Sequence, residues 1–356
     1  MGFIGSILVL AFLVFFHELG HFLAAKLFGV KVEAFSIGFG SQKLWKKQIG
    51  ETEYSLRPIP LGGFVQLKGQ SDIDPKNRNC DKDSLYGIAA YKRLIILAAG
   101  SFFNLFLAFL LYITIALIGQ NELAPIIGKV QEDMPASKAG LQAGDEIIAI
   151  NGESIKTWDK LNRVVESSVG VLEITFVRDL QTQNTTLIPK LGQSKNIFGE
   201  EISRPLIGII AANEIRKISY SPLESISYAF SQTLQASTLI LQGLEKIIFG
   251  VVPFSEVGGV VSIVSITKKA TELGIVTLLT FTALISVNLG ILNLLPIPAL
   301  DGGHIVFTLY EMITKKIPSL NTIYRLTLAG WVILFGLMGL GLYNDVVRII
   351  NGTMPF

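Results

Sequence analysis

Four long apolar segments constrain the fold of this chain more than any other feature. They cover residues 3–28, 94–119, 274–300 and 326–343, and an α-helix needs about 20 apolar residues, with a range of roughly 17–25, to cross a bilayer. Half of the 356 residues are hydrophobic, 16% are charged, and the mean hydropathy is +0.52, which is too apolar for an ordinary soluble protein. The predicted fold class is an α-helical polytopic membrane protein with about four transmembrane helices.

Basic residues indicate how these helices are oriented. Residues 29–93 contain eleven Lys and Arg, residues 301–325 contain three, and the tail at 344–356 contains only Arg348. Because loops rich in Lys and Arg remain on the cytoplasmic side, we expect cytoplasmic loops at 29–93 and 301–325. Both termini and the segment between the second and third spans are then extracytoplasmic. A net charge of +2 gives no indication of nucleic-acid binding.

The first apolar segment contains a metal-binding pattern, His17-Glu18-Leu19-Gly20-His21. Residues four apart share one face of a helix, so both imidazoles can bind one metal ion, and zinc suits this spacing best. Glu18 stands beside them, where a general base would take a proton from water. Such a pattern also occurs by chance, but ionisable groups inside a spanning helix are costly and usually functional. We therefore predict His17 and His21 as ligands and Glu18 as the base.

A third ligand must come from another part of the chain, because catalytic zinc sites typically use three protein ligands and one open position. The end of the third apolar segment, 296–304, has the sequence Pro-Ile-Pro-Ala-Leu-Asp-Gly-Gly-His. Its prolines break a helix and its glycines permit a tight turn, and irregular backbone at membrane depth lines protein or a watery cavity. Asp301 is therefore the candidate ligand. His304 is a rival that spacing does not exclude, and a simple helix-capping role for Asp301 is the alternative.

The segment between the second and third spans is predicted to contain an inserted, extracytoplasmic PDZ-like domain at 120–204. Residues 134–152 match the PDZ signature almost completely, and short runs of alternating polarity around them indicate β-strands. PDZ domains capture peptide ends by strand addition, so peptide C-termini are candidate partners. A size filter or a structural cover are alternative roles. Residues 205–273 are predicted to be an amphipathic helical segment at the membrane interface.

The motifs together resemble the site-2 protease family of intramembrane zinc metalloproteases, in particular its bacterial regulator of sigma-E protease branch. The resemblance rests on the His17–His21 motif, Asn293 and the turn at 300–302. Residues 35–40 and 59–65 resemble that branch's cytoplasmic β-hairpin region, and Gly100 and Asn104 its second-span motif. Ser101 and Val260 stand where the branch usually has proline, and the chain has room for one PDZ domain where well-known members have two.

The resemblance implies a function and a set of site residues. His17, His21 and Asp301 would bind Zn²⁺, Glu18 would be the base, and Asn293, Gly62, Gly63 and Asn104 would contact substrate. The implied reaction is cleavage within transmembrane segments of single-span proteins, such as pre-trimmed anti-sigma factors or remnant signal peptides, in regulated intramembrane proteolysis. The implied location is the bacterial cytoplasmic (inner) membrane, in contact with lipid, with the active site toward the cytoplasm. The resemblance also disfavours His304 as a ligand.

Two other classes of protein share some of these features. A non-catalytic membrane receptor or scaffold would use the PDZ-like domain to bind exported peptide ends and would keep a vestigial metal site. A zinc transporter would also place His and Asp inside the membrane. Neither class needs a base beside the ligands, so Glu18 favours the protease.

Overall fold

Among the residues that the computed structural model describes, four helices are long and apolar enough to cross a membrane: α1 (Gly2–Leu27), α2 (Ala90–Ile118), α7 (Ile275–Asn293) and α9 (Leu320–Ile350). The structure describes residues 2–70 and 79–354. Large apolar side chains such as Leu8, Phe102 and Phe335 are exposed on these helices, as expected for surfaces that face lipid. Four apolar helices are thus confirmed, and they are consistent with a multi-pass membrane protein.

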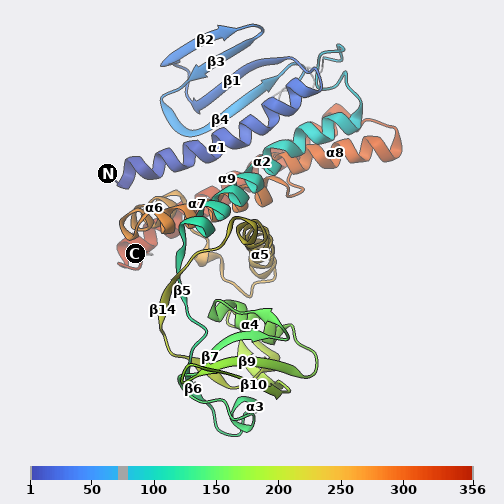
Figure 1. The fold of residues 1–356 in the computed structure, drawn as a ribbon. Coiled ribbons are helices and arrows are strands. Elements are labelled where there is room, and N and C mark those ends of the chain that lie inside the picture. Colours follow the sequence, from blue (N-terminus) through green and yellow to red (C-terminus); the bar gives the residue numbers. More distant parts are fainter. Residues whose placement is uncertain (1, 71–78, 355–356) are drawn as a thin grey trace. The chain divides into compact units, whose positions relative to one another are not determined.

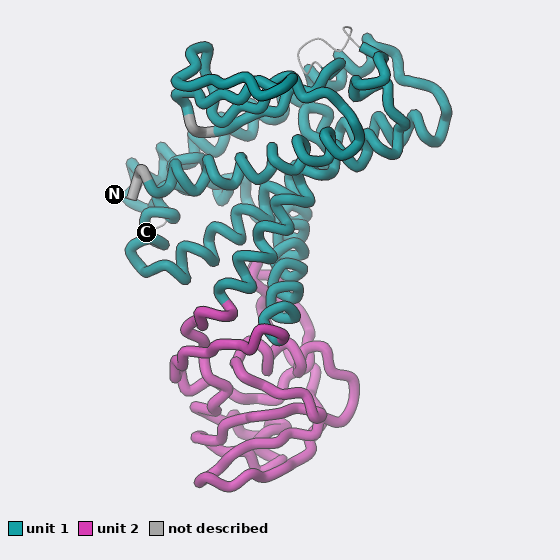
Figure 2. The backbone as a smooth tube through the Cα atoms, turned by 45° about the horizontal axis from the view of Figure 1, so that its top comes forward, with its two compact units in different colours: residues 1–115, 224–356 teal, residues 116–223 magenta. Residues whose placement is uncertain are grey.

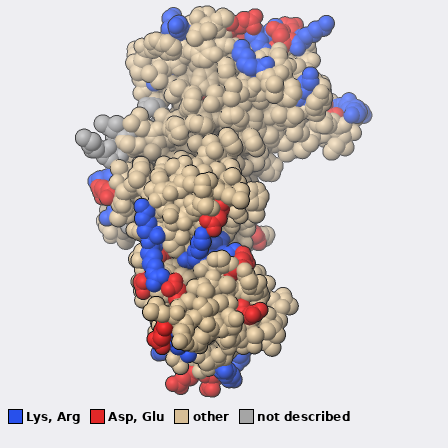
Figure 3. Space-filling view, in the orientation of Figure 1, with Lys and Arg blue, Asp and Glu red and all other residues tan. Residues whose placement is uncertain are grey.

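The chain forms two compact units, residues 1–115 with 224–356 and residues 116–223 (Figure 2). The first unit contains most of the length of the four spanning helices, a β-sheet, and the helices α5 (Pro222–Ile248), α6 (Val260–Leu273) and α8 (Asp301–Thr314). Charged side chains of this unit gather mainly over the sheet and its neighbouring loops, and the helices are largely free of them (Figure 3).

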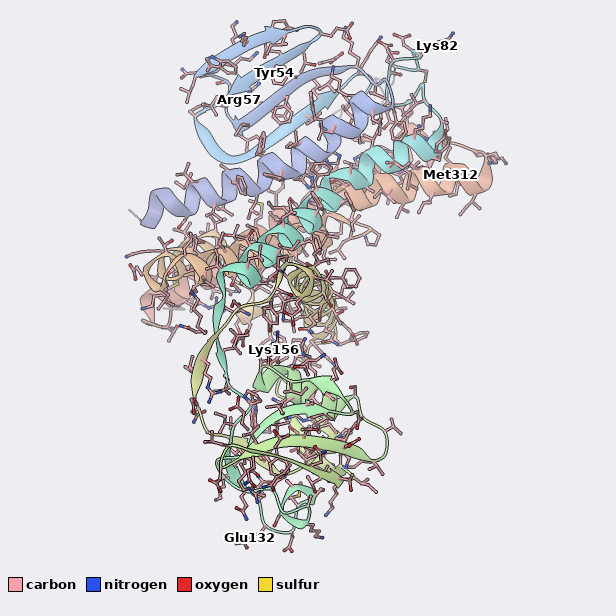
Figure 4. All side chains as sticks on the ribbon, in the orientation of Figure 1. Tyr54, Arg57, Lys82, Glu132, Lys156 and Met312 are labelled. Carbon is pink, nitrogen blue, oxygen red and sulfur yellow. The ribbon has the colours of Figure 1, made fainter. Side chains whose placement is uncertain are left out.

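The sheet of the first unit has four strands, β1 (Val32–Phe39), β2 (Trp45–Ile49), β3 (Thr52–Leu56) and β4 (Ile59–Leu67), in the order β2-β3-β1-β4. The expected hairpin is therefore part of a mixed sheet, in which β1 is parallel to β3 and antiparallel to β4. The sheet lies along α1 (Figure 1), and Tyr54 is one of the residues of its strand β3 (Figure 4). The Phe22 ring of α1 lies 5.3 Å from that of Phe35 and 6.0 Å from that of Tyr54, centroid to centroid. Aromatic packing thus attaches the sheet to a spanning helix.

The last two predicted spans differ from the observed helices. α7 ends at Asn293, because the prolines at 296 and 298 exclude helix up to residue 300. The predicted loop at 301–325 contains α8, and α9 runs over 320–350 where only 326–343 was expected. The hydrophobic pattern predicted only the central part of α9, where apolar residues are continuous. Ser319 caps the start of this helix by accepting a hydrogen bond from the Thr322 amide (3.1 Å).

The second unit is rich in short strands. It contains β5 (Gln120–Leu123), β6 (Ile127–Val130), α3 (Pro135–Lys138), β7 (Glu146–Ile150), β8 (Glu153–Ser154), α4 (Trp158–Glu166), β9 (Leu172–Arg178), β10 (Gln181–Leu187), β11 (Lys190–Lys195), β12 (Glu201–Leu206), β13 (Ile209–Ala211) and β14 (Ile215–Ile218). One sheet has the order β10-β9-β7-β8, and the other strands form pairs. Its core contains Ile127, Ile147, Ile150, Leu161, Leu172, Ile174 and Phe176. Within the PDZ-like motif the chain forms a helix at 135–138, a strand at 146–150 and a turn at 151–152.

The predicted helical segment at 205–273 is partly wrong. Residues up to 218 are strands, since β13 pairs with β6 and β14 pairs with β5. These partners lie about 80–100 positions earlier in the chain, so local periodicity gives no sign of the pairing. The helices begin only at Pro222, where α5 packs Ala229 and Ala236 into a core with Tyr112 of α2 and Val287 of α7.

Candidate metal centre

Three side chains from distant parts of the chain converge between α1 and α8. His17 Nε2 lies 3.2 Å from His21 Nε2, and Asp301 Oδ2 lies 3.2 Å and 3.3 Å from these two nitrogens. Their side chains are mostly buried, with 12%, 11% and 21% of their surface exposed. The three side chains that the sequence predicted as ligands thus lie close together.

The geometry of this donor set fits a tetrahedral metal ion. Ligand bonds of about 2.0–2.1 Å, as zinc makes with His and Asp, give a tetrahedron with an edge of about 3.3 Å, close to the three distances here. Asp301 Oδ2 is buried and has no hydrogen-bond partner within the described residues. A buried carboxylate oxygen without such a partner is costly, and a cation between the three donors would satisfy it.

The turn before α8 brings Asp301 to this position. A Cβ atom on Gly302 would lie 2.1 Å from the Leu295 carbonyl oxygen, and one on Gly303 would lie 2.3 Å from Pro298 Cα. Only glycine permits such close approach of two backbone segments. Asp301 therefore occupies the first turn of α8, where the positive end of the helix dipole favours a carboxylate.

His304, the rival ligand, does not belong to the cluster of donor atoms. Its ring contacts that of Phe307, with centroids 6.2 Å apart, and it lines a small cavity of about 20 Å³ together with Arg93 and Glu311. The structure therefore favours Asp301 over His304.

Helix α2 lines the opposite side of the two histidines. His21 Nδ1 donates a hydrogen bond to the Ile96 carbonyl oxygen (2.8 Å), which leaves the Nε2 lone pair directed at the cluster. A Cβ atom on Gly20 of α1 would lie 2.4 Å from the Ala99 carbonyl oxygen, so the helix backbones approach closely. A backbone carbonyl has no sequence signature, and the role of Ile96 was not predictable.

Asn104 is fully buried and lies beside the other histidine, with its Nδ2 3.3 Å from His17 Nδ1. Its Oδ1 is buried and has no hydrogen-bond partner among the residues that the structure describes. A half-turn of the amide exchanges the two atoms and lets Oδ1 accept a hydrogen bond from Nδ1–H of His17. That arrangement satisfies the orphaned oxygen and leaves the Nε2 lone pair of His17 free for a metal.

Glu18 lies between the histidines and β4. Its carboxylate interacts electrostatically with His17, His21 and Asp301 and lies near the backbone of Val65. A Cβ atom on Gly63 would lie 3.4 Å from Glu18 Cγ. The structure thus brings the candidate base, the donor cluster and the edge strand β4 together.

The remaining predicted substrate residues lie in different surroundings. A Cβ atom on Gly62 would overlap the Phe39 ring at 1.8 Å, so this glycine provides room for a neighbouring strand. Asn293 is the last residue of α7 and is half-buried. Among the described residues, its side chain makes no hydrogen bond to the donor cluster.

The chain is similar to known proteins over most of its length. The sequence profile described as Peptidase family M50 matches residues 5–337. A protein of Campylobacter jejuni named "Putative zinc metalloprotease" is 46% identical over 349 residues, covering 98% of this chain and 94% of that protein. Proteins with the same description from Helicobacter pylori strain J99 and Rickettsia conorii are 38% and 34% identical, each covering 98% of this chain and 100% and 99% of their own length.

Among solved structures, the PDZ domain of an SdrC-like protein from Listeria monocytogenes aligns with 24% of this chain. The alignment covers 84% of that domain, at 24% sequence identity and a TM-score of 0.19. The PDZ-like assignment of the second unit therefore rests on its motif at 134–152 and on its own elements.

Proposed function

Because the chain belongs to peptidase family M50, the site-2 protease family, as the sequence resemblance predicted, we propose that it is a membrane-embedded zinc metalloprotease that cleaves peptide bonds within the transmembrane segments of single-span proteins. One observation carries the proposal: three donor atoms lie 3.2–3.3 Å apart beside a carboxylate. The two histidines and this carboxylate belong to a helix that is long and apolar enough to span a membrane.

His17, His21 and Asp301 would hold the zinc ion through two Nε2 atoms and one Oδ2 atom. When bound, zinc lowers the pKa of water toward neutrality and polarises a carbonyl group. The Ile96 carbonyl holds the His21 ring in the required tautomer, and Asn104 does the same for His17. We therefore assign Asn104 to the orientation of a ligand, although the sequence had suggested contact with substrate.

Glu18 is the proposed general base. Its carboxylate takes a proton from the attacking water and returns it to the nitrogen of the leaving amine, so the group ends each cycle in its starting state. The backbone of Val65 lies near this carboxylate. Burial among helices and the sheet limits access of bulk water, so the proton moves between groups that are already positioned.

Substrate would bind as an extended strand beside β4. A spanning helix hides its carbonyls in internal hydrogen bonds and must unwind before attack. β4 is an edge strand of its sheet, and the backbone of Val65, on β4, lies near Glu18. A strand added to this edge, near Gly62 and Gly63, would pass close to the base. Asn293 is the proposed contact for the substrate or its oxyanion.

The location and the partners follow from charge and resemblance. We propose the bacterial cytoplasmic membrane, with residues 29–93 and the active site toward the cytoplasm and the PDZ-like unit outside. Pre-trimmed anti-sigma factors and remnant signal peptides are the proposed substrates, in regulated intramembrane proteolysis. The PDZ-like unit would bind peptide ends or exclude large outer domains.

The test uses the intact protein, purified with its native zinc, and a membrane-spanning reporter with a short outer domain. Glu18→Gln should retain zinc and lose at least a hundredfold in cleavage rate. His304→Ala is the matched control, because His304 lies outside the donor cluster, and it should retain both zinc and cleavage. A Glu18→Gln variant that cleaves like the wild type would overturn the proposal, and zinc binding without cleavage of several reporters would favour the PDZ-centred receptor.

A further inference from the structure

An ion pair between a buried arginine and a partly exposed glutamate connects α2 with α8 at a distance from the donor cluster. Arg93 lies in the first turn of α2 and is 3% exposed. Its Nη2 pairs with Glu311 Oε2 near the end of α8, close to Met312, which marks that end in Figure 4. The guanidinium also lies over the Tyr86 ring, 5.1 Å from its centroid.

This position is unfavourable for an arginine. The N-terminus of a helix carries partial positive charge, so a cation in the first turn of α2 is destabilised. Burying the charge adds a desolvation cost that one partner offsets only in part. Arg93 Nε, moreover, is buried without a hydrogen-bond partner within residues 2–70 and 79–354. Stability alone therefore does not explain an arginine at this position.

The same helix supports both histidines. Along α2, Arg93 precedes Ile96, which accepts the hydrogen bond of His21, and Asn104, which lies beside His17. Arg93 and Asn104 are eleven residues apart, about 16 Å along the helix axis. Asp301 and Glu311 are ten residues apart on α8, about 15 Å. The α2 segment and the α8 segment therefore have similar lengths. They meet at the donor cluster at one end and at the ion pair at the other.

We propose that Arg93 and Glu311 are positioning residues that hold α8 in register with α2, so that Asp301 reaches the two histidines. The inference rests on the proposed function, because it assumes that the three donors bind a metal. Through these contacts one helix orients all three donors: His21 through a carbonyl, His17 through an amide, and Asp301 through the ion pair and the rigid length of α8. Neither residue of the pair touches the reacting atoms.

The test measures the metal centre directly in the full-length protein in nanodiscs. Each variant is stripped of zinc and titrated with Co²⁺, whose visible absorption reports tetrahedral coordination. Arg93→Met and Glu311→Gln remove one charge each, and the double variant Arg93→Glu with Glu311→Arg reverses the pair. Lys43→Met is the matched control, because it breaks the ion pair of Lys43 with Glu53 in the same unit.

We expect both single variants to bind Co²⁺ at least tenfold more weakly and with a less intense tetrahedral spectrum, and to cleave reporter with a reduced kcat at unchanged KM. The reversed pair should recover most of the affinity, and Lys43→Met should match the wild type. The proposal is overturned if Glu311→Gln, which preserves side-chain size, binds Co²⁺ with wild-type affinity and spectrum. Tetrahedral Co²⁺ binding by a wild type that cleaves no reporter would instead contradict the proposed function alone.

Discussion

Gly100 of α2 lies directly against His21 of α1: a Cβ atom on Gly100 would come within 2.3 Å of His21 Nε2 and within 2.7 Å of His17 Cε1. Any larger residue must displace a ring that the Ile96 carbonyl holds in place. Overpacking of this kind costs about 1–3 kcal/mol. The candidate metal centre therefore depends on glycine at position 100.

Gly100→Ala should weaken zinc binding roughly 5- to 150-fold, since the strain falls on two ligands and each 1.4 kcal/mol corresponds to about tenfold. The measurement is competitive zinc titration of the purified protein. Gly336→Ala in α9 is the control, because a Cβ atom there meets nothing within 4 Å, and it should leave zinc binding unchanged. Wild-type affinity in Gly100→Ala would contradict the observed packing.

Replacing Asn104 separates two roles for this residue. Asn104→Leu removes the partner of His17 Nδ1, and loss of such a supporting hydrogen bond typically weakens metal binding about 10- to 100-fold. Asn104→Asp keeps an acceptor and should retain most of the zinc. If Asn104 instead contacts substrate, the Leu variant would raise the KM of the reporter and leave zinc affinity intact.

Gly303→Ala should displace Asp301 from the histidines, because the added methyl would lie 2.3 Å from Pro298 Cα and 2.4 Å from the Ile297 carbonyl oxygen. We expect zinc content and cleavage to fall together, by roughly tenfold or more for a strain of about 1.4 kcal/mol. Metal analysis beside a cleavage assay gives both values, and a variant that loses cleavage but keeps full zinc would show that this turn serves another purpose.

The edge of β4 can be tested with proline, which removes a backbone donor. Val65→Pro should abolish reporter cleavage, because it alters the backbone near Glu18 and interrupts the proposed docking edge. Lys47→Pro is the matched control on β2, the opposite edge of the sheet. It also removes a backbone donor from an edge strand but lies away from Glu18, so it should retain most of the cleavage. Equal loss in both variants would mean that only the integrity of the sheet matters.

The stability of the second unit should depend on pH through Glu122. Burial, with the nearby charge of Asp159, raises the pKa of this carboxyl above its ordinary value of 4.5. The folded state therefore holds the proton more tightly, and the stabilisation it gives is present below pH 4.5 and is lost as pH rises through the folded pKa. Glu122→Gln cannot ionise, so its advantage over the wild type should grow from pH 4 to pH 7.

Hydrogen exchange of the full-length protein measures this effect, since protection factors for β5 and β14 report local unfolding. The wild type and Glu122→Gln should agree at pH 4 and diverge toward pH 7, with the variant better protected. The same protection in both proteins at every pH would contradict the raised pKa.

Residues of the candidate site were predictable where the chemistry is local. His17, Glu18 and His21 lie within five positions, so the helical repeat alone places them on one side of α1. The prolines at 296 and 298 predict an interruption of the helix at membrane depth, because proline itself lacks the backbone N–H donor that a helix needs. The buried role of Asn104 and the strands at 205–218 depend on partners far away in the chain, and no local pattern reports them.

The choice of the third ligand shows the same division. Asp301 and His304 are three residues apart on α8, so they lie only about 60° apart around the helix axis, and both carry donors that a metal accepts. By itself the amino-acid sequence determined the spanning helices, the histidine pair and the break that precedes α8. Only the tertiary structure decided that Asp301 faces the histidines and His304 faces Arg93 and Glu311, because the rotation of α8 is set by close packing of Gly302 and Gly303 against residues 295–298.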